Sequence, residues 1–262
     1  MMEKLIVCAA LLALPACQPR VTGSDVADEQ VVSPCQPVVF EDSPLTHCVA
    51  DPASHAIRTV LADETGKPLR SLTALSRASS IDPGNTAFAT NAGMFEAGGG
   101  PVGYYVEDGE RLQTLNRAKG PGNFHLLPNG VFFGDTEGNW RVLDSAAFAQ
   151  QITRRPDFGT QSGPMLVIDG ELHPAIDYDG TSRKIRNAVG IDRQGRAHFV
   201  ISEAPLSFGK LARFYRDVLN TPNALFLDGS VSQLWDPVRV RMDTGAALGP
   251  LIVVEKRAKA AS

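Results

Sequence analysis

The stretch Ala188-Val189-Gly190-Ile191-Asp192-Arg193-Gln194-Gly195-Arg196-Ala197-His198-Phe199-Val200-Ile201 holds two short apolar segments on either side of a Gln-Gly pair. Both segments are rich in β-branched and aromatic side chains, which is typical of strands. The glycine between them can adopt the positive φ that a tight turn requires. This stretch therefore predicts two strands joined by a tight turn.

The same pattern recurs along most of the chain. Further short apolar runs lie at residues 38–40, 47–51, 56–61, 87–90, 102–106, 124–127, 131–133, 141–143, 165–168, 224–227 and 251–254. Turn signals separate several of them, namely Asp108-Gly109, Asn129-Gly130 and Asp169-Gly170. The chain is thus expected to consist mainly of short strands.

Helical signals are few, and nothing divides the body of the chain. Ser207 precedes a segment, 208–219, with one apolar face, and shorter candidates lie at 72–75 and 145–151. No linker rich in Pro, Gly or Ser interrupts the strand-like pattern. We therefore predict one α+β domain over residues 35–262, with a large mixed or antiparallel sheet and few helices.

The composition excludes several classes of protein. The chain has 262 residues, 43% of them hydrophobic and 21% charged, which is ordinary for a globular protein and unlike a disordered one. Its 25 basic and 29 acidic side chains give a net charge of −4, without the broad cationic face that nucleic-acid binding needs. Nucleic acid is therefore not an expected partner. Four cysteines are too few for a scaffold built on disulfides.

The N-terminus has the pattern of an export signal. Lys4 precedes an uncharged apolar run, 5–14, that is too short to span a bilayer and fits a secretory signal. Leu14-Pro15-Ala16-Cys17 resembles a bacterial lipobox, which implies lipidation of Cys17 and a signal peptide over residues 1–17. Gln18 replaces the Asp of an inner-membrane retention signal, so we expect an outer-membrane lipoprotein on the periplasmic face. The alternative is a plain secretory signal cleaved near Ala16.

Export also gives the remaining cysteines a meaning. Residues 18–34 are polar and predict a flexible tether. Cys8 leaves with the signal and Cys17 carries the lipid, so Cys35 and Cys48 remain in the body. An oxidising compartment favours a disulfide between these two, and two separate buried thiols are the alternative.

Five motifs place polar groups beside glycines or short side chains near apolar runs. They are Asn91-Ala92-Gly93-Met94-Phe95, Pro128-Asn129-Gly130-Val131-Phe132, Gln161-Ser162-Gly163-Pro164, Arg186-Asn187-Ala188-Val189-Gly190 and Phe226-Leu227-Asp228-Gly229-Ser230. Such positions let a ligand approach the backbone and leave N–H groups for an anion. The chain has no Gly-x-Ser-x-Gly, no His-x-x-x-His and no phosphate-loop motif.

In this order the five motifs resemble the phosphodiester glycosidase family, which includes an enzyme that removes N-acetylglucosamine from a sugar phosphodiester. The resemblance runs from about Ala56 to Val254. It implies an exported hydrolase of sugar-1-phosphodiesters in envelope or exopolysaccharide material. Better-known members carry three glycines and a serine after the Asp, whereas Asp228-Gly229 is followed here by Ser230-Val231-Ser232. This departure leaves a non-catalytic binding protein for carbohydrates or polyanions as the alternative, and a phosphodiesterase of teichoic-type polymers as a weaker one.

Arg186, Asp228 and His173 are the candidate catalytic residues. A guanidinium matches two phosphate oxygens, and the resemblance favours this role for Arg186 over a structural ion pair. The carboxylate of Asp228 can transfer a proton, act as a nucleophile or bind a metal, and the alternative is an Asx turn to Ser230. His173 can exchange a proton near neutral pH, although a lone His is more often structural.

The candidate substrate-binding residues lie in the same motifs: Asn91, Gly93, Ser162, Gly163, Gly229 and Ser230. The Asn91 amide can orient a sugar hydroxyl or a phosphate oxygen, or it can form a turn beside Gly93. Ser162 and Gly163 can present a hydroxyl and an N–H to an anion, or form a turn that enters a strand. Ser230 and Ser232 can bind phosphate or close a turn.

Three features of the site stay open at this level. A second carboxylate is expected for glycoside chemistry, and Glu96, Asp177, Asp179 and Glu203 are candidates of equal standing. A divalent cation is possible, because Asp228 and nearby hydroxyls are hard oxygen ligands, but no metal site is assigned. Phe95, Tyr104, Tyr105 and Trp235 are aromatic side chains that can stack on a sugar or pack in the core.

Overall fold

The strands predicted at 188–191 and 197–201 lie in the middle of the largest sheet. The computed structural model describes residues 32–258. In it β12 (Asn187–Ile191) and β13 (Ala197–Ser202) are antiparallel neighbours, and Gly195 in the turn between them has a φ of 81°. The largest sheet has seven strands in the order β1 (Cys35–Phe40), β2 (Ser43–Ala50), β13, β12, β14 (Asn223–Asp228), β10 (Met165–Ile168) and β11 (Glu171–Leu172).

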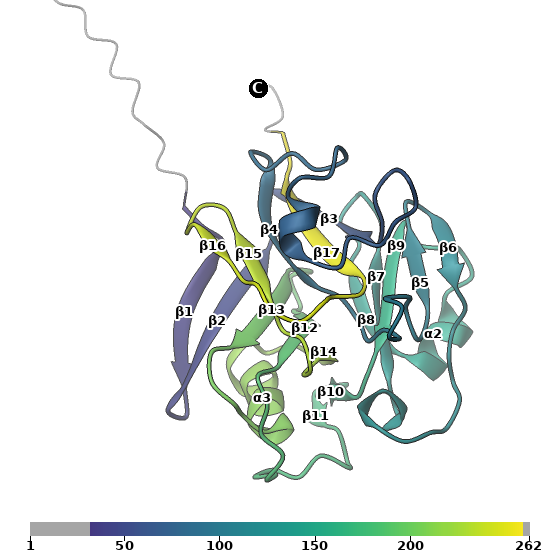
Figure 1. The fold of residues 1–262 in the computed structure, drawn as a ribbon. Coiled ribbons are helices and arrows are strands. Elements are labelled where there is room, and N and C mark those ends of the chain that lie inside the picture. The colour runs from purple at the N-terminus through teal and green to yellow at the C-terminus, as the bar shows by residue number, and fades with distance from the viewer. Residues whose placement is uncertain (1–31, 259–262) are drawn as a thin grey trace, which may run out of the picture. The chain divides into compact units, whose positions relative to one another are not determined.

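Two five-stranded sheets complete the β-structure (Figure 1). The second sheet has the order β16 (Arg241–Met242), β15 (Leu234–Asp236), β4 (Thr86–Asn91), β17 (Leu251–Lys256) and β3 (His55–Val60). The third has the order β6 (Glu110–Gln113), β5 (Tyr105–Glu107), β9 (Phe158–Ser162), β7 (Gly130–Gly134) and β8 (Arg141–Asp144). Every pairing of named strands is antiparallel, so the predicted fold class is confirmed, with three sheets in place of one.

The helices lie where the sequence predicted them. They are α1 (Leu72–Leu75), α2 (Ser145–Gln151) and α3 (Phe208–Arg213), and α3 continues into a π-helical turn, η2 (Phe214–Val218). Ser207 caps α3, because its hydroxyl accepts a hydrogen bond from the Lys210 N–H at 3.2 Å.

The three sheets meet in one aromatic core. Phe199 of β13 packs edge to face against Phe88 of β4 and Phe132 of β7, with ring centroids 5.3 and 5.8 Å away. All three rings are buried, and each comes from a different sheet. Burying a phenylalanine contributes roughly 1.5–3 kcal/mol, so this contact stabilises the arrangement of the sheets.

Two local predictions were wrong. Residues 124–127 do not form a strand, because the 3-10 turn η1 (Asn123–His125) occupies this segment after Gly122, whose φ is 85°. Asn129-Gly130 does not form a tight turn either. The side chain of Asn129 is buried and receives a hydrogen bond from the Ser145 hydroxyl at 2.6 Å, while Gly130 begins β7. Tertiary contacts decide both segments.

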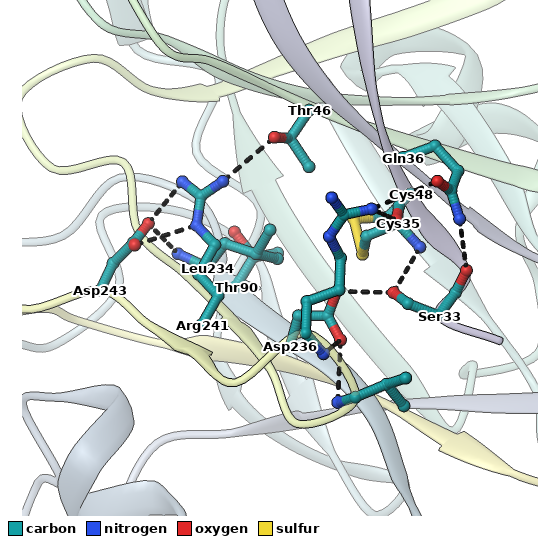
Figure 2. The surroundings of a disulfide bond; sticks show 12 residues. Ser33, Cys35, Gln36, Thr46, Cys48, Thr90, Leu234, Asp236, Arg241 and Asp243 are labelled. Carbon is teal, nitrogen blue, oxygen red and sulfur yellow. Dashed lines mark hydrogen bonds and ion pairs between the residues drawn. A yellow bond between two sulfur atoms is a disulfide. The ribbon is translucent and has the colours of Figure 1, made fainter. Parts of the chain in front are cut away.

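The predicted disulfide between Cys35 and Cys48 is confirmed. The two residues are directly opposite each other in the β1–β2 pair, with Cα atoms 3.9 Å apart. Figure 2 shows that this bond lies where the hairpin contacts the second sheet. Ser33 donates to the Asp236 carboxylate at 2.5 Å, and Arg241 donates to both Thr46 and Asp243. Ser33, two residues before the boundary predicted at Cys35, is buried, and the boundary itself stays a prediction.

Replacing both cysteines by serine is expected to lower the free energy of unfolding by about 3 kcal/mol, because the cross-link restricts a short loop of the unfolded chain. Chemical denaturation with and without a reductant measures this change. The wild-type protein should lose stability on reduction, and the Cys35→Ser/Cys48→Ser variant should not respond. Equal stability of the oxidised wild type and the variant would contradict the expectation.

The export predictions lie outside the described residues. The signal peptide, Cys17 and residues 18–31 of the tether all precede Val32, where the description begins. Within residues 32–258, no helix combines the length and the apolar character needed to cross a membrane.

Candidate functional site

Asp228 lies at the end of β14, where the chain turns into the loop 229–232. One carboxylate oxygen, Oδ1, accepts hydrogen bonds from the N–H of Ser230 at 2.7 Å and of Val231 at 3.4 Å. The Asx turn considered for Asp228 is therefore present. It leaves Oδ2 without a hydrogen bond to any described residue, although the side chain is only 7% exposed.

The surroundings of Asp228 favour its protonated form. Burial raises the pKa of its carboxyl group, and the hydrogen bonds from the loop N–H groups oppose this rise without cancelling it. No Lys, Arg or His among the described residues forms an ion pair with it within 4.0 Å. A buried carboxyl group that keeps its proton to a higher pH than usual is suited to act as a general acid.

An amide network fixes the backbone of Asp228. The Asn187 side-chain oxygen accepts from the Asp228 N–H at 3.0 Å, and its NH₂ group donates to the Asn91 side-chain oxygen at 3.0 Å. Asn91 also receives the N–H of Gln233 at 3.0 Å, and both asparagines are buried. The network thus ties β14 to β4 and β12. Asn91 is used here as a positioning residue, and direct contact with a sugar stays a prediction.

Arg186 is a buried cation without a counter-ion. Its side chain is 1% exposed, and its guanidinium carbon lies 3.6 Å from the ring centroid of Phe208. Nε donates to the Leu206 carbonyl at 3.0 Å and Nη2 to the Ser182 carbonyl at 3.1 Å, but Nη1 has no hydrogen-bond partner. No described carboxylate lies within 4.0 Å, so the structural ion pair considered for Arg186 is absent.

The free nitrogen of Arg186 lies beside the Asp228 loop. A Cβ atom added at Gly229 would lie 3.5 Å from Nη1, an ordinary contact distance, and 2.9 Å from the Phe226 ring, so a larger residue here would have to displace that ring. Burial lowers the pKa of Arg186 to about 10, which leaves the group charged at neutral pH. An uncompensated charge in a buried place is costly unless an anion binds to it. Arg186 and Gly229 therefore form a candidate anion site next to Asp228.

A cavity of about 510 Å³ opens over this loop. Asp228, Gly229 and Ser230 form one wall, and the segments 94–97 and 121–125 form the others. Glu96 and His125 line the same cavity. The carbonyl of Ala118 can only accept a hydrogen bond, so its 2.8 Å contact assigns the proton of His125 to Nδ1 and leaves Nε2 as an acceptor. Both side chains can take a proton from a bound water.

Among the candidates for a second carboxylate, the cavity favours Glu96. Asp179 and Glu203 form ion pairs with Arg213 and Arg241, and neither lines the cavity, nor does Asp177. Phe95 is the one predicted aromatic platform in the cavity wall, whereas Tyr105 and Trp235 are buried in the protein.

Other predicted site residues have packing roles in the structure. The Ser162 hydroxyl donates to the Leu227 carbonyl at 2.6 Å, and a Cβ at Gly163 would lie 2.7 Å from the Asn129 side chain. A Cβ at Gly93 would lie 2.2 Å from the Gln161 carbonyl oxygen. These groups bring β9 and the loop after β4 against β14. Their predicted contacts with substrate stay predictions.

His173 is not brought together with Asp228. It is buried beside β11 (Glu171–Leu172), does not line the cavity, and accepts a hydrogen bond from the Ala175 N–H at 3.1 Å. Burial lowers the pKa of its imidazole, which is therefore neutral at pH 7. The position matches the structural role considered for it, and His125 takes its place as the histidine of the cavity.

Sequence reasoning missed two residues, His125 and Asn187, as members of the site. His125 lies in a segment predicted as a strand, so its access to a cavity had no signal in the sequence. Asn187 belongs to the motif Arg186-Asn187-Ala188-Val189-Gly190, and its position next to Arg186 was the signal that could have indicated a role in the site. Within residues 32–258, no group of three or more His, Cys, Asp and Glu side chains is arranged to hold a metal ion. A divalent cation stays a prediction that a chelator would test.

A buried carboxyl group in a cavity wall and an unpaired guanidinium buried beside the same loop, in a mainly β unit, define a candidate site for hydrolysis of an anionic substrate. The chain belongs to the phosphodiester glycosidase family, whose model matches residues 84–253. The predicted family is thereby confirmed.

Three similar proteins illustrate the relationship. The uncharacterized protein YigE of Escherichia coli (strain K12) is 38% identical over 154 residues, which are 58% of this chain and 59% of that protein. A hypothetical protein from Synechocystis has a TM-score of 0.60 and 15% identity over 85% of this chain and 61% of its own. The catalytic domain of zebrafish N-acetylglucosamine-1-phosphodiester alpha-N-acetylglucosaminidase, auto-inhibited by its pro-peptide, has a TM-score of 0.58 and 14% identity over 85% and 82%. The two solved structures share the fold.

Proposed function

We propose that the protein is an exported hydrolase that cleaves a sugar-1-phosphodiester of the N-acetylglucosamine-phosphate type in envelope or exopolysaccharide material. The observation that carries the proposal is the unpaired guanidinium of Arg186 beside the Asp228 loop. A phosphodiester carries a single negative charge and would therefore supply the counter-ion that Arg186 lacks. Its sugar can occupy the cavity in front of Asp228.

Arg186 and the residues of the cavity divide the reaction between them. Arg186 neutralises the phosphate, whose negative charge grows as the bond between C1 of the sugar and the bridging oxygen breaks. Asp228 donates its proton to that bridging oxygen. Water attacks C1 and gives a proton to Glu96 or to Nε2 of His125, which line the same cavity. The products are a free sugar and a phosphomonoester.

The place of action is part of the proposal. Lipidation of Cys17 would hold the protein at the periplasmic face of the outer membrane, through the tether that precedes Val32. A glycan of the envelope would then lie within its reach.

Purified protein incubated with the methyl diester of N-acetylglucosamine-1-phosphate should release N-acetylglucosamine, measured by chromatography. Saturable binding of this diester without any turnover would favour the non-catalytic binding protein instead. An activity that a chelator removes and one divalent cation restores would add a metal to the site.

A further inference from the structure

A second hollow, of about 390 Å³, lies on the third sheet, away from Asp228. Arg111 of β6 lines one side, and Arg154 and Arg155, which follow α2, line the other. Tyr104 and Phe148 lie beneath, both buried and with ring centroids 4.8 Å apart. The three arginines thus surround a hollow whose base is formed by two packed aromatic rings.

These three charges have no counter-ions. No carboxylate lines the hollow, and among the described residues none lies within 4.0 Å of a nitrogen of Arg111, Arg154 or Arg155. Arg155 donates to the Gly109 carbonyl at 3.3 Å, and all three side chains are exposed. In a protein with a net charge of −4, this concentration of like charge raises the local affinity for anions.

The arginine hollow and the Asp228 cavity each share one lining residue with a third hollow. This third hollow, of about 400 Å³, is lined by residues 113–118 and Val102. It shares Leu115 with the arginine hollow and Val102 with the Asp228 cavity. Arg117 adds a fourth exposed cation in the third hollow, and no carboxylate lines it. The three hollows are therefore neighbours through Leu115 and Val102.

We propose that these neighbouring hollows form a binding groove for an anionic glycan chain, with the residues around Arg111, Arg154 and Arg155 as a subsite for its charged groups. The substrate class is then a polymer with repeated negative charges. For the reaction at Asp228 the inference rests on the proposed function, whereas binding at the arginines stands without it. A glycan is favoured over an anionic membrane because the cations line hollows that neighbour the reaction cavity through Leu115 and Val102.

The test measures binding of a fluorescent dextran sulfate oligosaccharide to the full-length protein by anisotropy, with uncharged dextran as the reference. The variant Arg111→Gln/Arg154→Gln/Arg155→Gln removes the subsite. Its matched control, Lys67→Gln/Arg77→Gln/Arg193→Gln, removes the same charge from exposed side chains that line none of the three hollows. We expect the subsite variant to bind dextran sulfate at least about tenfold more weakly than the control variant at low salt, and the difference to shrink at high salt.

Equal affinities of the two variants, or equal binding of dextran and dextran sulfate by the wild type, would overturn the inference. So would a preference for vesicles containing phosphatidylglycerol that depends on the same three arginines. The subsite variant should hydrolyse the small methyl diester as the wild type does. If the wild type hydrolyses no diester but still binds dextran sulfate through these arginines, the proposed function fails and the groove stands.

Discussion

Asp228→Asn is expected to lower kcat on a sugar phosphodiester about 10²–10⁴-fold, because an amide cannot donate the proton that the leaving oxygen needs. The same substitution should make the protein more stable at neutral pH. Burial raises the pKa of Asp228, so the folded protein pays a cost for its charged form, and the asparagine removes this cost while its oxygen can still accept from Ser230. Initial rates and thermal unfolding of the two proteins measure both effects.

The sign of the pH dependence follows from the raised pKa. The stability that the Asp228 carboxyl group contributes is fully present below its unfolded pKa and is lost as the pH rises through its folded pKa. The stability gain of Asp228→Asn should therefore vanish in acid and grow toward neutral pH. Activity of the wild type should fall as the pH rises through the same folded pKa.

Asp192 provides the control. It is as buried as Asp228, but it bonds to His198 at 2.9 Å and Arg196 at 2.7 Å, and its pKa is lowered despite its burial because these hydrogen bonds favour the charged form. Asp192→Asn should therefore destabilise the protein at neutral pH and leave the rate per folded molecule unchanged. An active Asp228→Asn variant would exclude Asp228 as the acid.

Arg186→Met should reduce kcat/KM about 10²–10³-fold, the range found when a donor to a developing anion is removed. It should also abolish stabilisation by phosphate. If inorganic phosphate binds at Nη1 of Arg186, it raises the unfolding temperature of the wild type above that in chloride of equal ionic strength. The variant approximates the length of the side chain but removes its hydrogen bonds to the Leu206 and Ser182 carbonyls, which costs about 1–3 kcal/mol even though the Leu206 carbonyl still accepts the Lys184 N–H at 3.2 Å.

Arg241→Met separates loss of the anion site from loss of a partly buried arginine. Arg241 forms ion pairs with Glu203 at 2.6 Å and Asp243 at 2.8 Å, so its role is structural. This variant should lose stability and still respond to phosphate. If Arg186→Met alone is too unstable to purify, Arg186→Lys keeps the charge without the guanidinium fork and should show the same loss of activity. If phosphate raised the unfolding temperature of either Arg186 variant as much as that of the wild type, the proposed anion site at Arg186 would be contradicted.

Local patterns predicted much of this fold because each strand carries its own signal. The runs at 188–191 and 197–201 became β12 and β13, and Ser207 caps α3. The strand predicted at 124–127 was wrong because an apolar run indicates burial and does not by itself indicate a strand. Phe124 is buried, but it lies in a 3-10 turn that packs on other segments. The cause lies in tertiary contacts that no short window contains.

The sequence predicted site residues correctly only where a single motif contained both the reactive side chain and the loop that places it at the site. Asp228 and Gly229 adjoin in sequence and in the cavity wall, and Arg186 lies beside them. Glu96 and His125 come from loops that are distant in sequence, and only the packing of the sheets brings them to the same cavity. Asn91 and Ser162 show the converse, because polar residues in the right motifs form hydrogen bonds within the protein itself, as His173 does outside the motifs.

Hydrolysis of the methyl diester of N-acetylglucosamine-1-phosphate in H₂¹⁸O tests the central claim most directly, because it reports which bond breaks. Attack of water at C1 places the label on the sugar, and attack at phosphorus places it on the phosphate. Mass spectrometry of the products should find ¹⁸O in N-acetylglucosamine and none in methyl phosphate, with the signal lost in Asp228→Asn. Label in the phosphate product, or no product from the folded wild-type protein, would contradict the account.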